Sequence, residues 1–150
     1  MTSNGFASEM DMSDIFCAEL NAQRTAWGKV SLLKEFNFSR GRTDVIAVDE
    51  DGALHAFELK LEKWSHALNQ AYRSTSFADF SYIVIPEKIA KRAVSHVEDF
   101  KKRSVGICTI GNKGLNVVLP AVYSEPIQPW LSKNAISKAL NQSQNDSAQY

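Results

Sequence analysis

Residues 42–71 read RTDVIAVDEDGALHAFELKLEKWSHALNQA, and this stretch decides the fold of the chain. Thr43 to Val48 is rich in β-branched residues, 49–52 (DEDG) is a turn signal, and 53–62 alternates between apolar and polar side chains. From Trp64 onward the apolar spacing changes to that of a helix. The stretch therefore predicts two antiparallel strands followed directly by a helix.

Apolar patterns on both sides of this stretch predict the remaining elements. An amphipathic helix is expected from Ser13, a good N-cap residue, to about Trp27. The other expected elements are a strand over 29–39, a buried strand over 81–86, a helix over 87–103, a hairpin over 105–119 and a short helix over 131–140. Strands before and after a helical crossover imply an α/β domain with a central mixed β-sheet flanked by helices.

The two ends of the chain are expected to lie outside this domain. Residues 1–12 are polar and predict a flexible N-terminus, which leaves 13–125 as a single α/β domain. Residues 126–150 form a C-terminal extension that is broken at its start by prolines. We expect a short helix there and then a disordered tail, NQSQNDSAQY.

Composition limits the classes of function. The 17 basic and 17 acidic residues balance, which argues against coating nucleic acid by bulk charge but leaves room for a local basic groove. No apolar run approaches the ~20 residues of a membrane span, and the N-terminus lacks signal-peptide features. Cys17 and Cys108 are far apart and are interpreted as core thiols. A cytoplasmic protein without membrane contact is predicted.

The two predicted strands carry a suggestive set of charges. Residues two apart share a face of a strand, so Glu58 and Lys60 point the same way. A loop of about five residues pairs Val48 with Leu54 and places Asp44 opposite Glu58. Facing carboxylates both stay ionised only if a cation compensates them, and Mg²⁺ prefers such oxygen ligands. The alternative is an ion cluster in which Lys60 simply neutralises Glu58.

Glu19 is a second unusual carboxylate. It falls near the middle of the apolar arc of the helix expected over 13–27, where an unpaired carboxylate costs several kcal/mol. Glu19 therefore needs a partner. Either it forms a salt bridge with an arginine, or the helix has a different phase, or the carboxylate serves a metal site.

Together these residues resemble the PD-(D/E)XK nuclease superfamily, which has a restriction-endonuclease-like fold. Asp44 matches the metal-binding aspartate of one strand, and Glu58-Leu59-Lys60 matches the (D/E)xK motif of the next. Gln70 is similar to a glutamine that some members carry on the following helix. Thr43 stands where the motif has proline. Glu19 would correspond to a glutamate of the first helix.

The resemblance implies a DNA endonuclease that depends on Mg²⁺ (or Mn²⁺) and recognises the shape or structure of its substrate. Asp44, Glu58 and Glu19 would hold the metal, with Glu35 as an alternative source of the extra carboxylate. Lys60 would orient the nucleophile, and Gln70 would steady the site or contact the nucleic-acid backbone. The residues expected to contact DNA phosphates are Arg40, Arg42, Lys63 and Arg73.

Several alternatives stay open at this point. RNA is a second candidate polymer, and cutting both strands of a duplex favours a homodimer. A non-catalytic nucleic-acid-binding module of the same fold and a protein-interaction or regulatory factor are the competing classes. A basic cluster on the helix expected over 87–103 is interpreted as a solvated face rather than a phosphate site. Its members are Lys88, Lys91, Arg92 and Lys102.

Overall fold

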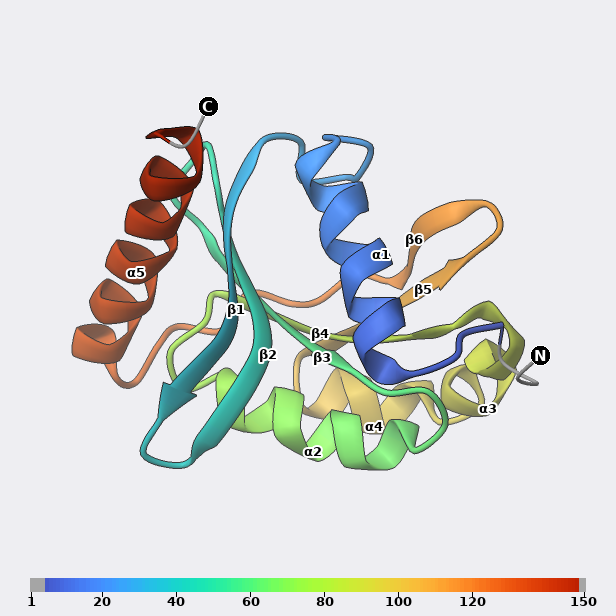
Figure 1. The fold of residues 1–150 in the computed structure, drawn as a ribbon. Coiled ribbons are helices and arrows are strands. Elements are labelled where there is room, and N and C mark those ends of the chain that lie inside the picture. Colours follow the sequence, from blue (N-terminus) through green and yellow to red (C-terminus); the bar gives the residue numbers. More distant parts are fainter. Residues whose placement is uncertain (1–4, 149–150) are drawn as a thin grey trace.

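Six strands lie side by side in the order in which they occur in the chain (Figure 1). The computed structural model describes residues 5–148. The strands are β1 (Val30–Phe38), β2 (Gly41–Asp49), β3 (Leu54–Leu59), β4 (Phe80–Pro86), β5 (Val105–Gly111) and β6 (Gly114–Leu119). Strands β3, β4 and β5 are parallel, whereas the other neighbours are antiparallel. The predicted mixed sheet flanked by helices is confirmed.

Two helical crossovers cover one face of the sheet. Helix α2 (Trp64–Ser74) joins β3 to β4, and η1 (Glu87–Ile89), α3 (Ala90–Val94) and α4 (Val97–Lys102) join β4 to β5. Their apolar side chains pack against those of β4 and β5 in a common core cluster. Figure 1 shows α2 and α4 below the sheet, opposite α1. One face of β3 is thereby buried beneath α2.

The expected helix over 87–103 is interrupted. Helix α3 ends at Val94 and α4 begins at Val97. At the break, Ser95 Oγ donates to the carbonyl of Arg92 at 2.8 Å, and His96 N donates to Ala93 O at 2.9 Å. These short-range hydrogen bonds use carbonyl groups that a continuous helix would need, so the chain turns here.

Helix α1 (Glu9–Asn21) begins and ends earlier than the sequence predicted. Ser8 is its N-cap, and Ser8 Oγ accepts a hydrogen bond from Asp11 N at 3.1 Å. The helix buries Met12, Phe16 and Leu20 against the sheet. Residues 9–12 are therefore helical rather than flexible, and 1–4 lie outside the described residues.

Helix α5 (Pro129–Ala148) is twice as long as the helix expected over 131–140 and runs through most of the segment expected to be disordered. It packs on β1 and β2, where Ala135 and Ala139 are fully buried beside Phe36 and Phe77. Tertiary packing stabilises a helix of weak local propensity. Residues 149–150 lie outside the described part. No described helix has both the length and the apolar character needed to cross a bilayer.

Candidate functional site

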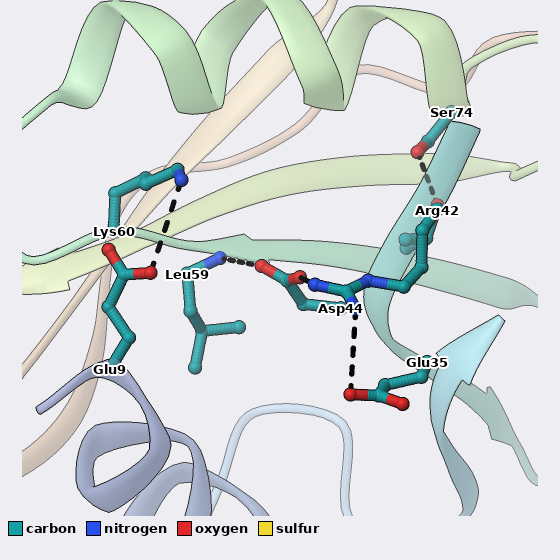
Figure 2. Close-up of polar contacts among 8 residues, drawn as sticks. Glu9, Glu35, Arg42, Asp44, Leu59, Lys60 and Ser74 are labelled. Atoms are coloured by element: carbon teal, nitrogen blue, oxygen red, sulfur yellow. Dashed lines mark hydrogen bonds and ion pairs between the residues drawn. The ribbon is translucent and has the colours of Figure 1, made fainter. Parts of the chain in front are cut away.

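The candidate site lies where β2 and β3 stop pairing through their main chains. Val48 pairs with Leu54 as predicted, and the observed pairing continues to Val45 and Phe57. One step further, Leu59 N donates to the side chain of Asp44, with a distance of 2.9 Å to Oδ2 (Figure 2). The carboxylate of Asp44 is thus fixed at the point where the two strands separate.

Neighbouring elements hold this point in place. Thr43 Oγ1 and Ser74 Oγ form a buried hydrogen bond of 2.8 Å, which ties β2 to the end of α2. Lys60 N donates to Val84 O at 3.1 Å, which ties the residue after β3 to β4. On the other side, Glu35 of β1 has a φ of 61°, a left-handed conformation that non-glycine residues rarely adopt. The site is therefore built on strands and a helix.

Glu58 is a buried carboxyl group without a hydrogen-bond partner. Its exposed fraction is 1%, and neither Oε1 nor Oε2 has a partner among the described residues. Burial, followed by the charge of Asp44 and the close approach of its side chain, raises the pKa of Glu58 to about 9, although Lys60 and Arg42 oppose the shift. The predicted proximity of the two carboxyl groups is therefore found, and Glu58 is protonated at neutral pH.

A divalent cation fits this pair of carboxyl groups. Buried oxygens without partners are costly, and a cation would both supply a partner and favour the ionised form. Mg²⁺ is commonly held by one or two carboxylates and otherwise by water and substrate oxygens. Among the described residues, no cluster of three or more His, Cys, Asp or Glu side chains suits a metal ion. Of the carboxylates predicted to hold the metal, the structure brings Asp44 and Glu58 together.

Arg42 lies between two carboxylates of the site. Its guanidinium group is 3.8 Å from Asp44 Oδ1 and 3.6 Å from Glu35 Oε1 (Figure 2). The sequence predicted a phosphate contact for Arg42. In the structure its charge partly neutralises the acidic side chains.

Glu9 is a residue of the site that the sequence reasoning missed. Figure 2 shows it reaching from α1 toward Lys60, with 4.0 Å between Glu9 Oε1 and Lys60 Nζ. Glu9 Oε2 also accepts a long hydrogen bond of 3.4 Å from Leu61 N. Ser8, followed three residues later by the acidic Asp11, matches the Ser/Thr-x-x-Asp/Glu pattern of a helix start. That pattern was the signal that could have placed Glu9 in a helix.

Glu19 does not join the site, so its predicted metal-binding role is corrected. It lies ten residues further along α1 than Glu9, which is about 15 Å at 1.5 Å per residue. Its carboxylate forms a salt bridge with Arg24, with 3.0 Å between Oε1 and Nη2. The alternative of an arginine partner is confirmed. Glu35, the other candidate, does lie in a hollow with Asp44.

Two hollows meet at Arg42 and Asp44. One has a volume of ≈ 310 Å³ and opens toward α2, where Gln70 and Arg73 join its lining. The other has a volume of ≈ 320 Å³ and opens between α1 and β1, where Glu9 of α1 and Glu35 of β1 line it. Gln70 Oε1 is buried without a hydrogen-bond partner among the described residues. Gln70 and Arg73 are thus brought to Asp44 as predicted.

The other two predicted phosphate contacts lie further away. Arg40 lines a neighbouring hollow of ≈ 440 Å³ and shares it with Arg73. Lys63 lines a separate hollow at the start of α2, beside Trp64 and His66. The structure therefore groups Arg40 and Arg73 but does not bring Lys63 to them.

Comparisons with known proteins support the fold only. No protein-family model matches the chain, and no curated protein matches it significantly. A solved structure of the SPO1766 protein of unknown function from Silicibacter pomeroyi is similar, with a TM-score of 0.65 and 13% identity, over 89% of this chain and 84% of that one. A repair endonuclease from Pyrococcus abyssi is more distantly similar. Its TM-score is 0.46 and its identity 21%, over 71% of this chain and 48% of that one. At that score the second similarity carries no functional inference.

Proposed function

We propose that this protein is a metal-dependent nuclease that hydrolyses DNA phosphodiester bonds at the site formed by Asp44, Glu58 and Lys60. The observation that carries the proposal is Glu58, a fully buried carboxyl group without a hydrogen-bond partner, next to Asp44 at the end of the β2–β3 pairing. A purely structural ion cluster would satisfy these oxygens with Lys60. Instead, the ion pair of Lys60 is with Glu9, at 4.0 Å between Nζ and Oε1.

Asp44 and Glu58 are the residues that would hold Mg²⁺ or Mn²⁺. When bound, such an ion polarises a phosphoryl oxygen and lowers the pKa of a water ligand. Lys60 would orient the attacking water and offset negative charge that develops on phosphorus. Glu9 holds the ammonium group of Lys60, while Gln70 and Arg73 face the same hollow as Asp44 and are available to the DNA backbone.

Nicking of supercoiled plasmid DNA tests this proposal. Wild-type protein with Mg²⁺ or Mn²⁺ is expected to nick the plasmid, and EDTA is expected to stop the reaction. Asp44→Asn and Lys60→Ala are each expected to lower the rate by about 10²-fold or more, the usual loss when a group that stabilises the transition state is removed. Asp51→Asn and Lys88→Ala are matched controls, since both residues are exposed and line neither hollow at Asp44.

Three results would count against the nuclease. These are absence of nicking with either ion, equal activity in wild type and Lys60→Ala, or equal losses in the control variants. Metal-independent binding without cleavage would instead support the non-catalytic nucleic-acid-binding module. Parallel reactions with RNA distinguish the two polymers. Sedimentation in the presence of duplex DNA tests the expected homodimer.

A further inference from the structure

A basic hollow adjoins the candidate site at Arg73. It lies between the end of α2, the end of α4 and residues 124–127, and it has a volume of ≈ 440 Å³. Its cationic lining residues are Arg40, Arg73, Lys102 and Arg103, against one carboxylate, Glu125. Arg73 also lines the hollow of Asp44 and Gln70. A volume of this size accepts a group as large as a nucleotide.

Most of this positive charge is not used within the protein. Among the described residues, Arg40, Arg73 and Lys102 form no ion pair with a carboxylate. Only Arg103 has an internal contact, donating to the Asp99 main-chain carbonyl at 3.1 Å. Cations that converge on a hollow without internal partners are available to phosphate groups.

An aromatic ring lines the same hollow. Tyr72 is 52% exposed, and the Arg103 guanidinium lies 6.0 Å from the centre of its ring. Exposed aromatic rings beside cations bind single-stranded nucleic acids, because unpaired bases are free to stack on them. Bases of an intact duplex are already stacked. Of the basic cluster that the sequence predicted on this helical segment, Lys102 lines the hollow. Lys88, Lys91 and Arg92 do not line it.

The wall of the hollow is held by main-chain hydrogen bonds. Val122 N donates to Ser104 O at 3.3 Å, and Ser124 N donates to Asp79 O at 2.9 Å. Gln128 N donates to Ser76 O at 3.0 Å. The segment before α5 is thus tied to the body of the domain, so binding a ligand here requires little ordering of the chain.

We propose that this hollow binds a nucleotide of a single-stranded segment that continues from the strand held at Asp44. Tyr72 stacks on a base, and Arg73, Lys102 and Arg103 contact the flanking phosphates. The inference rests on the proposed function and narrows its substrate class. The preferred substrate is DNA with a single-stranded arm beside the cleaved bond.

Equilibrium binding of a short fluorescent oligothymidylate to the full chain tests the inference. The measurement is made in EDTA, so that no cleavage occurs, and at several salt concentrations. Tyr72→Ala is expected to weaken binding about tenfold, whereas Tyr72→Phe keeps the ring and binds as wild type does. Lys102→Ala is expected to weaken binding severalfold and to lower the slope of log K against log salt by about 0.7. Lys88→Ala is the matched lysine control.

The outcomes separate this inference from the nuclease itself. Wild-type binding in both Tyr72→Ala and Lys102→Ala would overturn it, as would an equal loss in Lys88→Ala. Blunt duplex that competes as well as the oligothymidylate would also overturn it. Plasmid nicking that persists while the variants bind normally means that only this inference fails. Loss of binding in the variants without any nicking by wild type means that only the nuclease proposal fails.

Discussion

The carboxyl groups at the two ends of the β2–β3 hairpin differ in their hydrogen-bond partners. At the turn, Asp49 accepts hydrogen bonds from Asp51 N at 2.9 Å and Ala53 N at 3.0 Å, and it contacts His55 Nε2 at 2.8 Å. Burial alone would raise the pKa of Asp49, but the contacts with His55 and the main chain lower it below its usual value. At the open end, Glu58 has no such partner, and its pKa is raised.

The difference separates a carboxylate whose oxygens have protein partners from one whose oxygens do not. Asp49 closes a tight turn and its oxygens are satisfied by the protein, so its ionised form stabilises the native state. Glu58 is buried with only partial compensation from Lys60 and Arg42, and it destabilises the native state as its carboxyl group ionises. Strongly perturbed acids of this kind cluster at functional sites, where a bound cation or substrate completes them.

The largest expected loss of stability from a substitution is at the satisfied end. Asp49→Ala leaves Asp51 N, Ala53 N and the buried His55 ring without their acceptor. We expect a loss of about 3 kcal/mol in the free energy of unfolding, since each unsatisfied buried group costs about 1–3 kcal/mol. Urea unfolding at pH 7 measures it.

Glu50→Ala, an exposed change in the same turn, is the control for Asp49→Ala and should cost under about 0.5 kcal/mol. The stabilisation by Asp49 is present above its unfolded pKa and is lost as pH falls through its lowered folded pKa. Equal losses in the two variants would contradict a special role for Asp49.

Divalent ions are expected to bind and stabilise the protein only at the end of the hairpin that carries Glu58. Mg²⁺ at 100 times its dissociation constant stabilises a protein by about 2.7 kcal/mol. We therefore expect a rise in Tm for wild type and for Asp49→Ala, but not for Glu58→Gln. Binding should strengthen as pH rises toward 9, because the proton on Glu58 must leave before the carboxylate can bind the ion. A shift of equal size in Glu58→Gln would argue against this site.

The pH dependence of metal-free stability should differ between wild type and Glu58→Gln. The folded pKa of Glu58 is about 9, above its unfolded value near 4.5, so the native state holds a proton that the unfolded state has lost. Wild-type stability is therefore expected to fall between these pH values, by up to about 1.4 kcal/mol per pH unit from this group. Glu58→Gln removes this slope and should be the more stable protein at pH 8–9. Parallel curves in urea unfolding would contradict the buried protonated state.

The smallest effect distinguishes the two glutamates of α1. Glu9→Gln weakens the hold on Lys60 and is expected to lower the nicking rate about tenfold, a typical loss for a residue that orients a functional group. Glu19→Gln affects only the pair with Arg24 and should leave the rate within about twofold. The initial rate at saturating Mg²⁺ is the measurement. A larger effect at Glu19 than at Glu9 would reverse the assignment.

Local sequence was sufficient to predict how the central residues of the site are arranged. Strand alternation and the 49–52 turn determined the pairing of Val48 with Leu54, and hence the placement of Asp44 next to Glu58. The change to helical spacing at Trp64 placed Gln70 beside the same hollow. These features depend on neighbours within a few residues, where steric and hydrophobic periodicity act directly.

Only the tertiary structure decided the rest. Glu9 meets Lys60 and Leu61 across about fifty residues of chain, and no periodic pattern encodes that contact. Helix α5 forms over a polar sequence because Ala135 and Ala139 dock against the sheet. The raised pKa of Glu58 likewise requires α2 and the neighbouring strands to exclude water. Burial is a property of the assembled domain, so the sequence determined which residues carry charge, and packing determined which of those charges lack a partner.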